Sequence, residues 1–106
     1  MSINNKLKSL NISLPEPKDP VGEYVATKFA GKFLFISGQV SIDDKGNLIK
    51  GKLGKDLSTE DGYDAARRCG LSIVSQVKKA CKNDLDKIKS CIKLTGFVNS
   101  TDTFTE

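Results

Sequence analysis

Residues 33–40 read FLFISGQV and indicate the fold more strongly than any other stretch of the sequence. Phe33–Ile36 are four apolar residues in a row, and the polar group Ser37-Gly38-Gln39 follows at once. Aromatic and β-branched residues favour a β-strand, and a glycine in a strand marks a bulge or a close approach of the backbone to a ligand. Two interpretations of Ser37-Gly38-Gln39 stay open: a plain strand end, or a turn that lines a ligand site.

A partner strand is predicted directly before this run. Residues 23–30 (EYVATKFA) alternate two sets of side chains, and only Gly31-Lys32 separates them from the apolar run. Two β-rich runs joined by a short turn that contains glycine are typical of a β-hairpin. Because side chains alternate along a strand, we expect one face to carry Phe33, Phe35 and Ser37, and the other Leu34, Ile36 and Val40.

A long helix is predicted after a second turn at residues 43–47, a short strand at residues 48–49 and a glycine-containing connector. Ser58 and Asp61 have the spacing of a capping box at its start. Its apolar stripe recurs at intervals of three and four and consists of Ala66, Cys69, Gly70, Ile73, Val77 and Ala80. Gly70 costs the helix about 1 kcal/mol relative to alanine, and we expect a close approach to the underlying sheet as the compensation.

Residues 85–100 predict another strand region, in which Phe97 lies on the otherwise polar face and is expected to meet something other than water. Residues 100–102 are a helix N-cap cluster with no helix after them, which predicts a chain cut short. The element order indicates an α+β fold with a mixed β-sheet and helices packed on one face. Residues 1–22 form an extended lead-in with a short turn over residues 4–10, and residues 23–106 form a single domain that lacks its final helix and strand.

Composition excludes several classes of function. The net charge of +4 comes from 15 lysines and 2 arginines, scattered among 13 acids, so a solvated surface is favoured over a nucleic-acid interface. The absence of histidine excludes Ser-His or Cys-His nucleophilic pairs and zinc sites with histidine ligands. Three cysteines without CxxC spacing predict free thiols in a reducing, cytoplasmic compartment. No apolar run approaches the length of a membrane span.

The sequence resembles the YjgF/RidA family, also called the L-PSP family. The resemblance covers roughly residues 14–106. Ser37-Gly38-Gln39 after an apolar strand is its most specific element. The supporting motifs are Gly22-Glu23-Tyr24, Asp43–Gly46, Asp64-Ala65-Ala66, Asp86-Lys87-Ile88, Lys93–Val98 and Asp102-Thr103-Phe104.

This resemblance implies a chorismate-mutase-like fold that forms homotrimers, with sites in the clefts between subunits. It implies an enamine/imine deaminase, which hydrolyses reactive 2-imino acids to 2-keto acids and ammonia without metal or cofactor. Tyr24, Ser37 and Gly38 match the family's residues near the ligand, a small carboxylate, and the catalytic residues stay unassigned. The alternatives are a non-catalytic trimeric small-ligand-binding protein, or a ribonuclease or translation inhibitor of the L-PSP type.

The family's carboxylate-binding arginine and its C-terminal acidic residue find no match in this sequence, since the resemblance ends before them. Arg67 and Arg68 lie on the predicted helix and do not replace that arginine. An enzyme that grips a small carboxylate needs a cation at that point. We therefore expect the activity of this chain to be absent or impaired.

Overall fold

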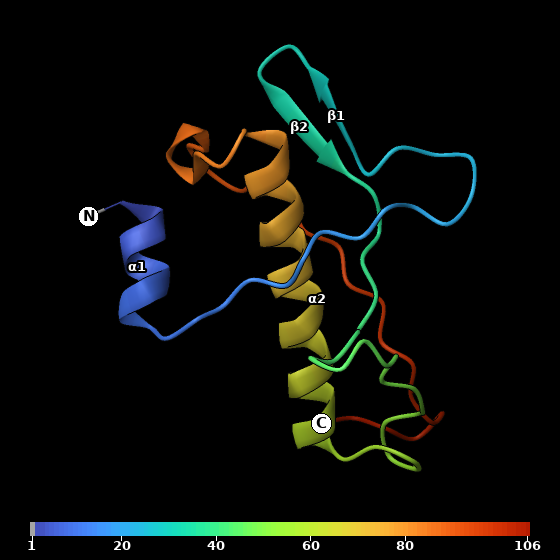
Figure 1. The fold of residues 1–106 in the computed structure, drawn as a ribbon. Coiled ribbons are helices and arrows are strands. Elements are labelled where there is room, and N and C mark those ends of the chain that lie inside the picture. Colours follow the sequence, from blue (N-terminus) through green and yellow to red (C-terminus); the bar gives the residue numbers. More distant parts are fainter. Residues whose placement is uncertain (1) are drawn as a thin grey trace. The chain divides into compact units, whose positions relative to one another are not determined.

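The computed structural model describes residues 2–106 and shows an α+β fold (Figure 1). Its elements in chain order are helix α1 (Ile3–Ser9), strands β1 (Thr27–Ala30) and β2 (Phe33–Ile36), helix α2 (Thr59–Ala80) and the 3₁₀ helix η1 (Leu85–Lys87). The chain divides into two compact units, each of which is described by itself. The first unit combines the segment up to Gln39 with Leu71–Ser90, and the second combines Val40–Gly70 with Cys91–Glu106.

The predicted hairpin is confirmed in the first unit. Strands β1 and β2 pair antiparallel with the register Thr27↔Ile36 to Ala30↔Phe33. Gly31 in the turn has a φ of 60°, a left-handed conformation that glycine adopts without steric cost. The first strand is shorter than the predicted residues 23–30, because the ladder continues beyond β1 only through the Ser37 N–H, which donates to the Ala26 carbonyl at 2.9 Å.

The register also confirms the predicted faces of β2. Residues that pair directly across an antiparallel ladder share a face, so Phe33 and Phe35 lie on the same side as their partners Ala30 and Lys28. Both phenylalanines are more than half exposed. The opposite face carries Leu34 and Ile36, which are half-buried.

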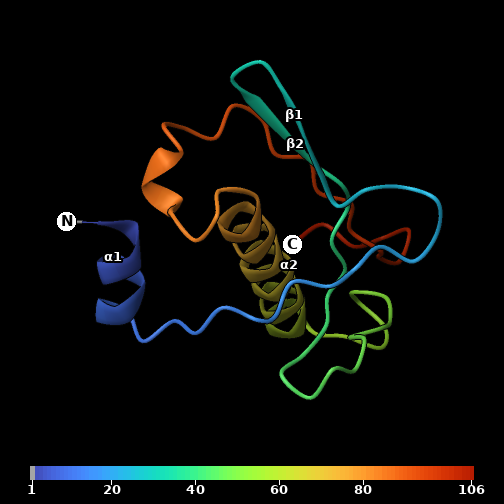
Figure 2. The same cartoon turned by 45° about the horizontal axis from the view of Figure 1, so that its top comes forward.

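An extended segment precedes the hairpin, as the three prolines of residues 1–22 predict, and the expected short turn is helix α1. The Ser2 hydroxyl caps α1 by accepting from the Asn5 N–H at 3.1 Å. The segment after α1 then runs across α2, in both views of the ribbon (Figures 1 and 2). Cys81 and Leu85 are the buried apolar residues of this unit, at the end of α2 and the start of η1.

In the second unit the predicted capping box is formed at the start of α2. The Ser58 N–H donates to Asp61 Oδ2 at 2.9 Å, and the Asp61 N–H donates to Ser58 Oγ at 3.1 Å. These bonds to Ser58 lower the pKa of the Asp61 carboxyl below its usual value. Further along the helix, Arg68 Nε donates to the Ile42 carbonyl at 2.8 Å and ties the loop of residues 42–48 to α2.

Two predictions about the sheet are wrong for the residues described. The sheet is two-stranded and antiparallel rather than mixed, and residues 91–99 are exposed and form neither helix nor strand. A strand needs a neighbour to satisfy its main-chain groups. Within residues 2–106, the one main-chain hydrogen bond of residues 91–99 to another segment runs from the Leu53 N–H to the Asn99 carbonyl. Phe97 is 96% exposed, so its predicted apolar partner stays a prediction.

The expected role of Gly70 is also wrong for the part of the chain described. No described atom lies within 4 Å of the point where a Cβ at Gly70 would be, apart from its own helix backbone and chain neighbours. A close approach to the sheet therefore does not explain this glycine, and α2 carries it at a cost in helix propensity.

Candidate functional site

Ser37 stands at the end of β2 and is held by two hydrogen bonds to the chain that enters β1. Its N–H donates to the Ala26 carbonyl at 2.9 Å, and its hydroxyl donates to the Val25 carbonyl at 2.5 Å. A serine hydroxyl has one proton to donate and two lone pairs to accept with. The hydroxyl proton of Ser37 is therefore used in the hydrogen bond to Val25 at the open end of the hairpin, and its two lone pairs can accept hydrogen bonds from another partner.

Gly38 leaves open space beside this serine. It is exposed, and no described atom outside its chain neighbours lies within 4 Å of where its Cβ would be. Its φ lies outside the left-handed range, so the backbone conformation does not require glycine there. Gln39 Nε2 folds back and donates to the Ser37 carbonyl at 3.1 Å. The missing side chain of Gly38 is consistent with either interpretation of Ser37-Gly38-Gln39.

Tyr24 lies at the same end of the hairpin as Ser37. It directly precedes Val25, whose carbonyl accepts the Ser37 hydroxyl, and 52% of its surface is exposed. Gly22, with a φ of 126°, lies beside the Tyr24 ring, and a Cβ there would be 3.5 Å from Cε1. Within residues 2–106, no hydrogen bond joins the Tyr24 and Ser37 side chains. The two residues are linked through Val25, which follows Tyr24 in the chain and whose carbonyl accepts the Ser37 hydroxyl proton.

Lys28 lies on the same face of the hairpin as Phe35 and Ser37 and was not predicted as a site residue from the sequence. Phe35 pairs with Lys28, and Ser37 bonds to Ala26 one step further along the ladder. Diagonal neighbours on one face of an antiparallel pair lie roughly 7–8 Å apart, within reach of a long side chain. Lys28 is exposed and is the one charged residue in β1 and β2. The alternation in residues 23–30 hinted at this face, but only the register connects it to Ser37.

A hollow of about 370 Å³ in the second unit is the other candidate for a ligand site, and it is acidic rather than basic. Its wall contains two carboxylates and no cation, and none of the predicted site residues lines it. Two of its lining residues are joined by a hydrogen bond, in which Thr59 Oγ1 donates to Glu106 Oε2 at 3.0 Å. The lining residues are Gly54, Leu57, Ser58, Thr59, Glu60, Phe104 and Glu106. Unpaired carboxylates repel an anion, so this hollow does not suit a carboxylate ligand.

The remaining reactive groups gather at no common point. Cys69, Cys81 and Cys91 are free thiols that are half-buried, buried and exposed respectively. Burial raises the pKa of the Cys69 thiol. Within residues 2–106, no group of three or more potential metal-ligating side chains is found, and no helix has the length and apolar character to cross a membrane. The end of the hairpin is therefore the candidate site.

Comparison with known proteins shows similarity over almost the whole chain. A family model described as "YjgF/chorismate mutase-like, putative endoribonuclease" matches residues 4–106. Protein TCP17 of Trypanosoma cruzi is 42% identical over 100 residues, which are 94% of this chain and 62% of that protein.

Two solved structures have the same fold. The protein Atu1372 of Agrobacterium tumefaciens, described as having unknown function, superposes with a TM-score of 0.84 at 35% identity, over 98% of this chain and 63% of its own. A protein of Shewanella oneidensis described as a "putative endoribonuclease" gives a TM-score of 0.75 at 31% identity, over 81% of this chain and 56% of its own. The chain thus spans less than two thirds of each relative. By the family match and these relatives, the chain belongs to the YjgF/chorismate mutase-like family.

Proposed function

We propose that the end of the hairpin binds a small carboxylate of the 2-imino or 2-keto acid class, and that the protein is a RidA-like enamine/imine deaminase whose activity in this chain is impaired or absent. The observation that carries the proposal is one exposed hairpin face with a hydroxyl at Ser37, a cation at Lys28 and an aromatic ring at Phe35. A carboxylate with a small apolar substituent needs this combination of a cation, a hydrogen-bond donor and an apolar surface.

Binding requires one exchange of hydrogen bonds at Ser37. Its hydroxyl donates to the Val25 carbonyl, so it has to rotate toward the ligand carboxylate. A bond to an ionised acceptor is roughly twice as strong as one between neutral groups, and Val25 is 61% exposed, so water can satisfy its carbonyl. Exchanging the bond to Val25 for a bond to the ligand carboxylate is therefore favourable, and the open space beside Gly38 leaves room for the ligand.

The reaction is a hydrolysis at the imine carbon. Water adds to the C=N carbon, the nitrogen leaves as ammonia, and a C=O bond forms in its place, so that no electrons are gained or lost. The residues at the hairpin end would hold the carboxylate beside this carbon, and the phenol of Tyr24 would lie beside the same ligand. No proton-transferring residue is assigned.

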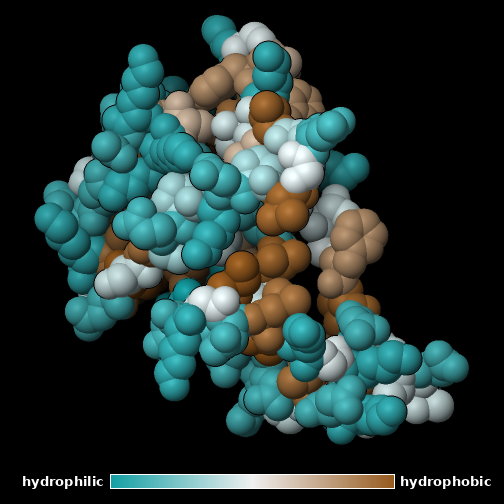
Figure 3. Space-filling view, turned by 45° about the vertical axis from the view of Figure 1, so that its right-hand side comes forward, coloured by the Kyte–Doolittle hydropathy of each residue, from teal (hydrophilic) through white to brown (hydrophobic). Residues whose placement is uncertain are grey.

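We further propose that the protein is a cytoplasmic homotrimer with its sites at the subunit clefts. Support comes from apolar side chains that reach the surface in each unit: Phe33 and Phe35 in the first, and Phe97, 96% exposed, in the second. In the space-filling view, brown apolar residues interrupt the hydrophilic surface (Figure 3). Light scattering on the protein should give three times the mass of one chain, and a stable monomer would contradict this assembly.

The binding proposal is tested by NMR titration of the protein with pyruvate, a 2-keto acid of the product class. We expect the amide signals of Ser37 and Gly38 to shift. Lys28→Gln should weaken binding, because it removes the cation of this face. The matched control is Lys32→Gln, which removes the same charge from the exposed turn and should leave binding unchanged. Equal binding by both variants would contradict the proposal.

A parallel assay of 2-iminopropanoate hydrolysis and RNA cleavage separates the alternatives. Pyruvate binding with imine hydrolysis, which we expect to be slow, supports the deaminase. Binding without hydrolysis supports the non-catalytic ligand-binding alternative. RNA cleavage without pyruvate binding supports the ribonuclease named in the family description.

A further inference from the structure

Two polar side chains of α2 are among the most deeply buried in the first unit. Ser75 and Gln76 are only 4% and 2% exposed. Burying a polar side chain costs free energy unless it finds a hydrogen-bond partner. Among the described residues, no buried side-chain polar atom is left without a partner, so these two residues are buried because something specific satisfies them.

Their partners are main-chain carbonyls of the extended N-terminal segment. Ser75 Oγ donates to the Pro15 carbonyl at 2.5 Å, and Gln76 Nε2 donates to the Lys18 carbonyl at 2.9 Å. Both bonds join residues about sixty positions apart in the sequence. The helix therefore recognises the segment by its backbone, whatever side chains the segment carries.

The prolines prepare residues 12–20 for this contact; we call these residues the strap. Pro15, Pro17 and Pro20 have no N–H to satisfy, and the residue before each proline is restricted to extended conformations. The strap thus enters the contact already extended and offers more carbonyls than amide groups. Less conformational entropy is lost when such a segment is ordered.

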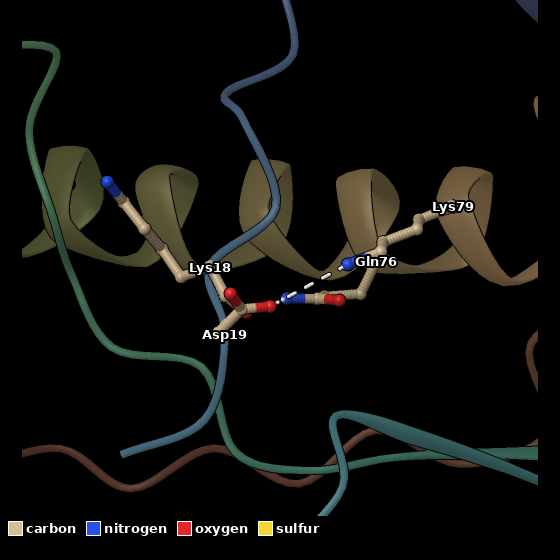
Figure 4. A network of polar contacts seen from close by, with 4 residues as sticks. All are labelled: Lys18, Asp19, Gln76 and Lys79. Atoms are coloured by element: carbon tan, nitrogen blue, oxygen red, sulfur yellow. Dashed lines mark hydrogen bonds and ion pairs between the residues drawn. The ribbon is translucent and has the colours of Figure 1, made fainter.

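The strap runs across α2 rather than along it. Its two accepting carbonyls are three residues apart, about 9 Å in an extended proline-rich chain, whereas their donors are adjacent in the helix. Consecutive helix side chains point about 100° apart, so two adjacent donors can bond to strap carbonyls that are three residues apart. Figure 4 shows the strap crossing the helix with the Gln76 amide directed at it.

An ion pair beside this crossing contributes little. Lys79 Nζ lies 3.8 Å from Asp19 Oδ1, and the two side chains are 60% and 94% exposed. Pairs as exposed as this one are worth about 0–1 kcal/mol at most. The buried neutral bonds from Ser75 and Gln76 therefore hold the strap.

We propose that Ser75 and Gln76 form a latch on α2, a binding site for the carbonyls of an extended, proline-rich segment, whose occupant is the chain's own strap. The latch fastens the N-terminal part of the first unit, including α1, whose Ile3 N–H donates to Asp86 Oδ1 at 2.9 Å. Opening the latch frees residues 12–20 and leaves α2 unaltered. This inference is independent of the proposed catalytic activity.

Trypsin provides a direct test, because the bond it cuts after Lys18 contains the carbonyl that Gln76 holds. The protease must take that carbonyl into its own oxyanion hole, so the closed latch protects the Lys18–Asp19 bond. The Lys32–Phe33 bond in the exposed hairpin turn serves as a reference within the same chain. Mass spectrometry follows both cuts over time. We expect Lys18–Asp19 to be cut more slowly than Lys32–Phe33 in the unaltered protein.

Gln76→Leu keeps most of the volume and removes the donor, so it should speed cleavage at Lys18–Asp19 about two- to tenfold, the factor equivalent to one neutral hydrogen bond. Ser75→Ala, which removes a single oxygen atom, should show the same selective increase to a smaller degree. Lys79→Ala, which removes only the exposed ion pair, should change the rate by less than about twofold.

The reference bond distinguishes a latch from ordinary core packing. If Ser75 and Gln76 only support the core, their variants unfold the whole unit more often, and both bonds are cut faster by the same factor. That result would overturn the proposal. Equally fast cleavage of both bonds in the unaltered protein would overturn it as well.

Discussion

Replacing Gly70 by alanine should stabilise the protein. Glycine in a helix interior is about 0.8–1.0 kcal/mol less favourable than alanine, and Gly70 lies twelve positions into the interval Thr59–Ala80 that forms α2. No described atom lies within 4 Å of the new Cβ, beyond the neighbouring helix backbone. Nothing therefore offsets the gain in propensity, and we expect the free energy of unfolding to rise by about 1 kcal/mol.

Gly62 in the same helix is the matched control. The same substitution brings the same gain in propensity, but here the new Cβ would lie 2.8 Å from Leu53 Cδ2 and 3.0 Å from Leu53 Cδ1. Real Cβ atoms do not come so close to a carbon, so the Leu53 side chain has to move. Gly62→Ala should therefore stabilise the protein less than Gly70→Ala, or destabilise it.

Urea and thermal unfolding measured by circular dichroism at the helix band provide the readout, since the chain has no tryptophan. For a domain of this size, 1 kcal/mol corresponds to a rise in Tm of about 4–8 °C. A fall in stability for Gly70→Ala would refute the reasoning. It would mean that another surface covers Gly70 in solution, as the sequence alone suggested, and a second copy of the chain would then be the first partner to test.

Three further results are expected from the start of α2 and from the thiols. Ser58→Ala removes the N-cap acceptor and should cost about 1 kcal/mol in urea unfolding; an unchanged midpoint would contradict the capping box. The pKa of Asp61 is lowered in the folded state, so its carboxylate stabilises the fold fully above the usual carboxyl pKa and loses this effect as the pH falls through the folded pKa. In Asp61→Asn, the free energy of unfolding should therefore fall less steeply as the pH is lowered. Iodoacetamide should modify exposed Cys91 first, Cys69 more slowly because burial raises its pKa, and buried Cys81 last; early modification of Cys81 would contradict its burial.

The end of the hairpin illustrates how far the sequence led toward the candidate site. The residues Tyr24, Ser37 and Gly38 were found from the family's pattern, and the structure brings the first two together through Val25. The sequence did not reveal that the Ser37 hydroxyl donates to Val25, or that Lys28 shares its face. Both facts depend on the pairing of two strands, and pairing can slip by one residue unless turn and burial select a register.

Local signals in the sequence were sufficient for the hairpin, the helix and the cap. A left-handed glycine at Gly31, the alternation within β2 and the three-residue spacing of Ser58 and Asp61 each act over a few neighbouring residues. Backbone sterics and the two periodicities of strand and helix determine such features without help from the rest of the chain. The sequence by itself therefore determined the hairpin, the long helix with its cap, and the family.

Only the tertiary structure decided what each element meets. Ser75 and Gln76 are polar residues that a sequence pattern assigns to solvent, yet they are buried because carbonyls about sixty positions away accept their protons. Gly70 belongs to the apolar stripe, yet no described atom outside its own helix backbone comes close to it. Burial and hydrogen bonding between distant segments depend on where the chain returns in space, and that information is spread over the whole fold rather than written in any short stretch of residues.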